Sequence, residues 1–349
     1  MNIFKNTFGI APSGEEVSLF TLQNGNITVK ITNYGCIITS IETPNRKGEM
    51  QNIVCGFEKF EDYISNAYLQ SYPYFGCILG RCANRIAKGK YVIDGVQYSG
   101  VVNNGENHLH GGADGFDKKV FSAEPFEKNG VVGLKLKYTS VDGEEGYPGE
   151  LTLTCIYELD SDGKLCMSYE AETNKKTILN ISNHSYFNLT AGAEDILNHE
   201  LELTAKNFTE SVEMIPTGRI LSVKGTPFDF TTKKTLGKDI ATLADGYDLN
   251  MVLDNENSKL VYAGCLSEQT SGRKVEVLTT QPGMQVYTGF WIPELEIAGK
   301  KKFGKFSGIA LETQHYPDSA NHENFPTVIL NPGEKFKETT IYQFGMLDA

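Results

Sequence analysis

The sequence lacks the features that would place the chain in a membrane or in an oxidising compartment. Its seven cysteines are scattered and include no CxxC pair, so reduced thiols in a cytoplasmic setting are the simplest account. No apolar run approaches the roughly 18 residues of a membrane-spanning helix. The first twenty residues also lack the apolar core and small-residue cleavage site of a secretory leader. We therefore expect a cytoplasmic protein.

Basic residues are too few and too dispersed to form a nucleic-acid surface. The chain has 32 Lys plus Arg against 44 Asp plus Glu, a formal net charge of -12, and no basic cluster. Such a chain cannot neutralise a row of phosphates, so nucleic acid and anionic membrane are poor partners. A neutral ligand rich in hydroxyl groups is compatible with this charge, although net charge alone selects none.

Most of the sequence consists of short segments in which apolar and polar residues alternate, and glycines separate these segments. There are 35 glycines in 349 residues, and they fall between segments with the period of two that is typical of β-strands. YVIDGVQY (91–98) reads as a hairpin with an Asp-Gly turn, and residues 151–169 read as a second hairpin. Helical patterns are confined to 58–70 and 233–243. No linker or repeat divides the chain, so we predict one all-β domain over residues 1–349, an antiparallel β-sandwich of two sheets packed face to face.

The segment SNHSYFNL places a histidine where a strand would normally carry an apolar or threonine side chain. Alternation over 179–189 puts His184 on a wholly polar face, together with Ser182 and Tyr186. An ordinary structural histidine bonded to a neighbouring serine or to backbone would explain this pattern. An acid with a pKa near neutrality, held on a rigid strand and facing a concavity, would explain it equally.

A glutamate occupies a comparable position in GIALETQHYPD (308–318). Alternation places Glu312 on one face with Gly308 and Ala310, whose small side chains leave room for a ligand against the carboxylate. The competing interpretation is a solvated glutamate on an edge strand.

Two histidines in NHLHGGADGFD (107–117) raise the question of a metal. His108 and His110 would point the same way on a strand, which is a possible half-site. The sequence shows no completing ligands at a recognised spacing, so metal is the weaker interpretation. The Gly-Gly that follows His110 favours a close approach of backbone to a ligand or to another loop.

Further polar groups suited to sugar hydroxyls lie in three other segments. Arg85 and Asn84 occur in GRCANRIAKGKY (80–91), and an arginine suits holding oxygens because it does not give up its proton. Asp248 lies in the turn DGYDLN, and Gln281 precedes the Pro-Gly of TTQPGMQVYTG (279–289). Each also has a local explanation, because turns favour aspartate and an arginine is often a surface residue.

In this order, the motifs resemble those of the galactose mutarotase (aldose 1-epimerase) family. The resemblance rests on GRCANRIAKGKY, LHGGADGFDKK, NISNHSYFNL, DGYDLN, TTQPGMQVYTG and LETQHYPDSANHENFPTVILNPGE, which together span about residues 80–340. It implies a β-supersandwich enzyme, an isomerase that interconverts the α and β anomers of free aldoses such as galactose or glucose. It also implies that neither a metal nor a cofactor is needed.

Site residues follow from the same resemblance, position by position. Glu312 resembles the family's general base and His184 its general acid. The positions that match its substrate-binding residues are Asn84, Arg85, His110, Asp248 and Gln281. One acid and one base suffice for the reaction: the base removes the proton from the C1 hydroxyl while the acid protonates the ring oxygen, and the opened aldehyde recloses on its other face.

Two departures from the family pattern put the preferred sugar in doubt. The family commonly has histidine after the aspartate of GYD, where this chain has Leu249. It commonly has asparagine after YTG, where this chain has Phe290, followed by its only tryptophan, Trp291. A pocket rim built from these side chains would favour a different hydroxyl pattern or a substituted sugar.

Three other functions remain open at this point. A glycosidase could use Glu312 and Asp248 as its carboxylate pair, but His184 would then have no necessary task. A sugar-binding protein could keep the fold without catalysis. A hexose-6-phosphate epimerase would need several basic residues around the pocket, and Arg85 is the only obvious candidate. The sequence does not distinguish a monomer from a homodimer.

Overall fold

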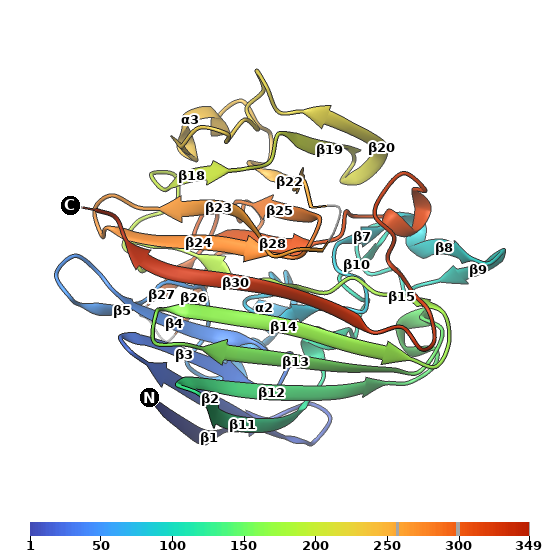
Figure 1. The fold of residues 1–349 in the computed structure, drawn as a ribbon, viewed down its shortest axis with the longest axis horizontal. Coiled ribbons are helices and arrows are strands. Elements are labelled where there is room, and N and C mark those ends of the chain that lie inside the picture. Colours follow the sequence, from blue (N-terminus) through green and yellow to red (C-terminus); the bar gives the residue numbers. More distant parts are fainter. Residues whose placement is uncertain (256–257, 298–300, 349) are drawn as a thin grey trace.

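The computed structural model describes residues 1–255, 258–297 and 301–348 and is built almost entirely from antiparallel strands (Figure 1). Its largest sheet has nine strands and includes the hairpin predicted over 151–169. In spatial order these strands are β11 (Ser122–Lys128), β12 (Val131–Ser140), β13 (Leu151–Leu159), β14 (Lys164–Thr173), β30 (Phe336–Met346), β24 (Arg273–Thr279), β23 (Val261–Ser267), β18 (Glu200–Leu203) and β21 (Lys234–Thr235).

Two further sheets complete the architecture. The N-terminal sheet, blue in Figure 1, contains β1 (Asn2–Ile10), β2 (Glu16–Asn24), β3 (Ile27–Thr32), β4 (Ile38–Pro44) and β5 (Met50–Asn52). The site-bearing sheet runs in the order β17 (Tyr186–Phe187), β28 (Ile309–Gln314), β25 (Gly283–Tyr287), β22 (Asp248–Val252), β19 (Asn207–Val212) and β20 (Ile215–Ser222). The all-β sandwich prediction is therefore confirmed, with large antiparallel sheets as expected.

Short elements connect these sheets. The two-stranded pairs are β6 (Ile78–Leu79) with β16 (Ser182–Asn183), β7 (Arg85–Ile86) with β10 (His108–Leu109), β8 (Lys90–Ile93) with β9 (Val96–Ser99), β15 (Thr177–Ile178) with β29 (Ile329–Leu330), and β26 (Leu295–Ile297) with β27 (Lys301–Phe303). The α-helices are α1 (Phe60–Tyr63), α2 (Asn66–Leu69) and α3 (Gly237–Ile240). They fall inside the two segments for which the sequence indicated a turn or two of helix. Within the described residues, no helix is both long enough and apolar enough to cross a membrane.

One continuous hydrophobic core joins the three sheets. β13 shows why: its side chains alternate between buried and partly exposed along the whole strand, so one face packs inward. The core cluster includes Val29 of the N-terminal sheet, Leu153 of the largest sheet and Leu311 of the site-bearing sheet. Such a shared core supports the prediction of a single domain, which stays a prediction.

Strands without apolar alternation were missed by the sequence reasoning. β1 is exposed along most of its length, and the β19–β20 hairpin ends in an exposed tip, so neither has the half-buried pattern that reveals a strand. The predicted strand over 179–189 was also wrong in one respect. It is split into β16 and β17, which pair with different sheets, and both of its faces are buried.

Candidate active site

His184 lies at the point where the chain leaves one sheet and enters another. Its backbone N–H donates to the carbonyl of Cys77 at 2.8 Å, and its own carbonyl accepts from the N–H of Gly76 at 2.9 Å. These two bonds hold the backbone between β16 and β17. Because the next residues turn into β17, which pairs with β28, the imidazole is directed toward the strand that carries Glu312.

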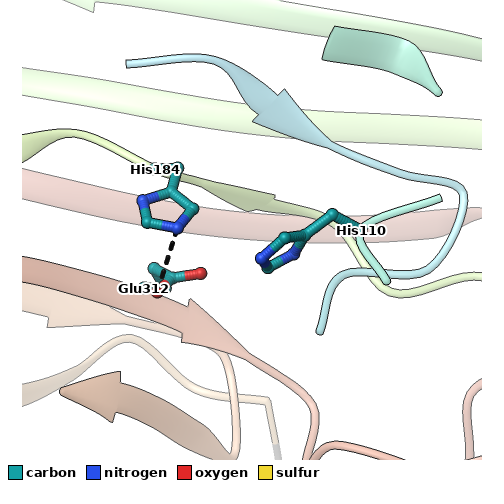
Figure 2. Close-up of side chains that lie close together, drawn as sticks. All are labelled: His110, His184 and Glu312. Atoms are coloured by element: carbon teal, nitrogen blue, oxygen red, sulfur yellow. Dashed lines mark ion pairs between the residues drawn. The ribbon is translucent and has the colours of Figure 1, made fainter. Parts of the chain in front are cut away.

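Glu312 and His184 meet in one pocket. The Nε2 atom of His184 lies 3.6 Å from Oε1 of Glu312, and Figure 2 shows the two side chains pointing toward each other with His110 beside them. The pocket that they line has a volume of about 380 Å³. Both side chains are buried, so the imidazole does not lie on a solvated face and the glutamate does not lie on an exposed edge. Because both line a pocket, the imidazole does not lie in a closed core either.

Burial moves the pKa values of this pair in opposite directions. It lowers the pKa of His184 to about 3 because the imidazolium loses hydration. It raises the pKa of Glu312 well above its ordinary value, an effect that the charge of Asp248 reinforces and Arg85 opposes. Between these two pKa values the pair therefore holds a single proton, which burial places on Glu312. Nδ1 of His184 and Oε2 of Glu312 have no hydrogen-bond partner among the described residues.

His110 is held in one tautomer by the backbone of Asn84. Its Nδ1 accepts the Asn84 N–H at 3.0 Å, and burial, with the charges of His184 and Arg85, lowers its pKa well below the ordinary value. The neutral ring must then carry its proton on Nε2. Nε2–H is a hydrogen-bond donor suited to a sugar oxygen.

The same tautomer argues against a metal at the cluster of His110, His184 and Glu312. One ligand atom of each lies within 4.8 Å of the others, which is close enough for a shared ion. However, the Nε2 of His110 has no free lone pair while its Nδ1 accepts from backbone. His108 cannot replace it, since its two ring nitrogens bond to the carbonyl of Val101 and the hydroxyl of Tyr147. The possible half-site of His108 and His110, which the sequence already made the weaker interpretation, is therefore not supported by these hydrogen bonds.

Asn84, Arg85 and Asp248 all line the pocket. Asn84 has a left-handed φ of 62°, and its side-chain oxygen accepts the N–H of Arg85 at 2.9 Å. Arg85 donates through Nε to the side-chain oxygen of Asn104 at 3.2 Å, which leaves the outer edge of the guanidinium for other oxygens. Burial raises the pKa of Asp248, and Arg85 opposes that shift.

Gln281 lies outside this pocket, and a different glutamine lies inside it. The Gln281 amide donates to the carbonyl of Ile181 at 3.2 Å and its oxygen bonds to Nδ1 of His315 at 2.8 Å. Gln285 lines the pocket instead and donates to Oδ1 of Asp248 at 2.6 Å. Gln285 pairs directly with Glu312 across β25 and β28 and so shares its face, but the sequence carried no signal of that pairing.

Three tyrosines that the motifs did not single out form the walls around the pair. Tyr186 stacks on His184 with ring centroids 4.7 Å apart. Tyr74 lies 4.7 Å from the ring of His110, and Tyr287 also lines the pocket, with its ring centroid 5.9 Å from that of Tyr186. Burial raises the pKa of the Tyr186 hydroxyl well above its ordinary value, so these walls stay neutral. Of the three tyrosines, only Tyr186 was indicated by the sequence, because alternation placed it on the same polar face as His184.

Of the three side chains expected at the pocket rim, only Trp291 lines this pocket. Leu249 belongs to the hydrophobic core because it alternates with Asp248 along β22 and faces the other way. Phe290 packs edge to face against Trp291, with ring centroids 5.0 Å apart. A direct effect of Leu249 or Phe290 on a bound sugar is therefore not supported.

Together, the fold and the site define a β-sandwich protein in which a buried imidazole and a buried carboxyl group meet in one pocket. The protein-family model described as aldose 1-epimerase matches residues 18–343. Galactose mutarotase of Bos taurus is 41% identical over 99% of both chains, and aldose 1-epimerase of Escherichia coli K12 is 31% identical over 97% of this chain and 98% of its own. The crystal structure of galactose 1-epimerase from Lactobacillus acidophilus superposes with a TM-score of 0.86 at 27% identity, covering 99% of both chains. The chain belongs to the aldose 1-epimerase family and is an isomerase.

Proposed function

We propose that this protein interconverts the α and β anomers of free aldohexoses such as galactose or glucose, with Glu312 as general base and His184 as general acid. The observation that carries this assignment is the 3.6 Å separation of their reactive atoms in one pocket. The C1 hydroxyl oxygen and the ring oxygen are both bonded to C1. One pyranose edge can therefore meet both groups at once.

Ring opening moves two protons in concert. Glu312 takes the proton from the C1 hydroxyl while His184 gives a proton to the ring oxygen, and the C1–O5 bond breaks to leave an aldehyde. The step converts a carboxylate and an imidazolium into a carboxylic acid and a neutral imidazole. Burial of both side chains favours that product state. The same burial places the resting proton on Glu312, so a proton must first pass from Glu312 to His184 before the ring can open.

Closure reverses the proton transfers on the other face of C1. Rotation about C1–C2 presents the opposite face of the aldehyde to the C5 hydroxyl. His184 then removes the C5 hydroxyl proton and Glu312 returns its proton to the carbonyl oxygen as the C1–O5 bond forms. The cycle leaves both side chains as it found them, so no cofactor is consumed and no metal has a step to perform.

The remaining polar groups support substrate binding. We assign to Asn84, Arg85, His110 and Asp248 the role of holding ring hydroxyls, because all four line the pocket. Gln285 takes the role that the sequence assigned to Gln281. Among the described lining residues, Arg85 is the only arginine or lysine, which favours an uncharged sugar over a hexose phosphate.

Polarimetry tests the proposal. Freshly dissolved α-D-galactose and α-D-glucose should reach their equilibrium rotation much faster with the protein than in buffer. Glu312→Gln should slow this by at least roughly 100-fold, the scale of a positioned base. Glu338→Gln is a matched control, because Glu338 is also buried but bonds to Thr280 away from the pocket. A rate equal to the buffer blank with every aldose would favour a non-catalytic sugar-binding protein.

A further inference from the structure

A buried asparagine next to the catalytic pocket has no part in the proposed chemistry. Asn250 follows Asp248 by two residues on β22 and so shares its face. It lies directly opposite Gln285 of β25 in the antiparallel register, and Gln285 in turn lies opposite Glu312 of β28. Asn250, Gln285 and Glu312 therefore form one polar row across three neighbouring strands.

The side chain of Asn250 is buried without a hydrogen bond. It is 2% exposed, and neither its Nδ2 nor its Oδ1 has a partner among the described residues. The Oε1 atom of Gln285 is also buried and unpartnered in this part of the structure, although its Nε2 donates to Asp248. Buried polar groups almost always bond to protein or to ordered water, so these three atoms mark a place where a polar partner binds.

A small cavity lies between these groups. Asn250 and Gln285 both line it, together with Thr209, Ser211 and Asp248. Its volume is about 10 Å³, which is about the smallest space that admits a water molecule. The polar lining can supply the two to four hydrogen bonds, roughly, that a buried water makes. The cavity is therefore suited to one water and to nothing larger.

A glycine makes room for the amide of Asn250. A Cβ at Gly283 would lie 2.6 Å from Oδ1 of Asn250 and 2.9 Å from the ring of Tyr316, which is closer than non-bonded atoms approach. The amide of Asn250 therefore packs directly against β25, the strand that also carries Gln285.

We propose that Asn250 is a positioning residue, which holds the amide of Gln285 through one water bound in this cavity. The water accepts from Nδ2 of Asn250 and donates to Oε1 of Gln285. With its oxygen held on this side, Gln285 presents its NH2 group to Asp248, as in the bond of 2.6 Å. A Gln285 amide that turned over would place its carbonyl oxygen against the Asp248 carboxylate, and two acceptors repel each other.

The proposal rests on the proposed function, in which Asp248 and Gln285 hold the sugar. Asn250 does not line the catalytic pocket, so its effect passes through Gln285. Loss of Asn250 should therefore weaken substrate binding and leave the proton transfers at Glu312 and His184 largely unchanged.

Two substitutions of Asn250 distinguish this role from simple packing. Asn250→Leu should raise KM for galactose by about fivefold and change kcat by less than about twofold, because the apolar side chain excludes the water and releases the Gln285 amide. Asn250→Ala should raise KM by less than about twofold, because the space that it leaves admits further water. Packing alone predicts the reverse order, since alanine leaves the larger cavity, and that order would overturn the proposal.

The effect should disappear when Gln285 is removed. In the Gln285→Ala background, Asn250→Leu should raise KM by less than about 1.5-fold, because no amide is left to position. A fivefold effect in both backgrounds would overturn the proposal. Asn255→Ala is the matched control: Asn255 is also buried, but it donates to the carbonyls of Lys259 and Thr280. It should lower the stability to urea without changing KM.

A high-resolution crystal structure tests the water itself. Wild-type protein should show a water peak within hydrogen-bond distance of Asn250 and Gln285, and Asn250→Leu should lack it. A wild-type structure without this peak would overturn the proposal.

Calorimetric binding of galactose to the Glu312→Gln variant, with and without Asn250→Leu, separates this proposal from the proposed function. Suppose that wild-type protein converts no aldose while Asn250→Leu still weakens galactose binding. The assigned catalysis would then be overturned and the positioning role supported. Rapid wild-type conversion with a KM that Asn250→Leu leaves unchanged would overturn the positioning role alone.

Discussion

The Nε2 atom of His184 lies 3.6 Å from Oε1 of Glu312, although the two residues come from distant parts of the chain and from separate structural segments. Their proximity makes them one chemical unit, because a proton taken by one group can be supplied by the other.

The acid and base should act non-additively. His184→Asn and Glu312→Gln should each slow anomer interconversion by at least roughly 100-fold, and the double variant should be little slower than the slower single variant. The reason is that either group alone cannot complete both proton transfers. Polarimetric rates for the four proteins give the comparison. A double variant whose loss equals the product of the single losses would mean that the groups work independently.

The pH profile of kcat/KM should be flat in mildly acidic solution and should fall on the alkaline side. The pair holds its single proton between the pKa of His184, lowered to about 3, and the raised pKa of Glu312. Below that window a second proton blocks the base, and above it the last proton is lost. Rates corrected for buffer catalysis would show the limbs. An acid limb centred near the ordinary histidine value of about 6.5 would contradict this assignment.

Substitution of Gln285 should weaken substrate binding, whereas substitution of Gln281 should lower stability. Gln285→Ala should raise KM for galactose by roughly tenfold, because a bound sugar and Asp248 lose a polar partner worth about 1–1.5 kcal/mol. Gln281→Ala should leave KM unchanged and lower the free energy of unfolding by about 1–3 kcal/mol, since the carbonyl of Ile181 loses a buried donor. Steady-state kinetics and urea denaturation of both variants distinguish these effects. A larger KM change in Gln281→Ala would restore the assignment made from the sequence.

A glycine beside His110 should be intolerant of any side chain. Gly111 has a φ of +97°, and a Cβ there would lie 1.8 Å from the carbonyl oxygen of Gly80. Gly130 has a comparable φ of +80° but open space around it. Gly111→Ala should therefore lower the free energy of unfolding by at least about 2 kcal/mol more than Gly130→Ala, as measured by urea denaturation. Equal losses would show that backbone conformation alone, rather than the contact with Gly80, sets the cost.

Local pattern was sufficient for most strands, since a strand with one buried face repeats every two residues. Alternation also placed Glu312 on a strand, although both faces of β28 are buried. The same logic failed at His184, because its segment changes sheets within a few residues. It also failed for Gln285, because its position in the pocket depends on register with Glu312 across a sheet. A single chain's alternation does not reveal which strands become neighbours.

The sequence by itself determined the all-β class, the family motifs and the candidate acid and base, because these depend on residue type and short-range periodicity. Only the tertiary structure decided that the imidazole and the carboxyl group meet in one pocket, that Leu249 faces the core, and that Trp291 stands open at the mouth. Those properties depend on burial and on distances between segments far apart in the chain, which long-range packing sets.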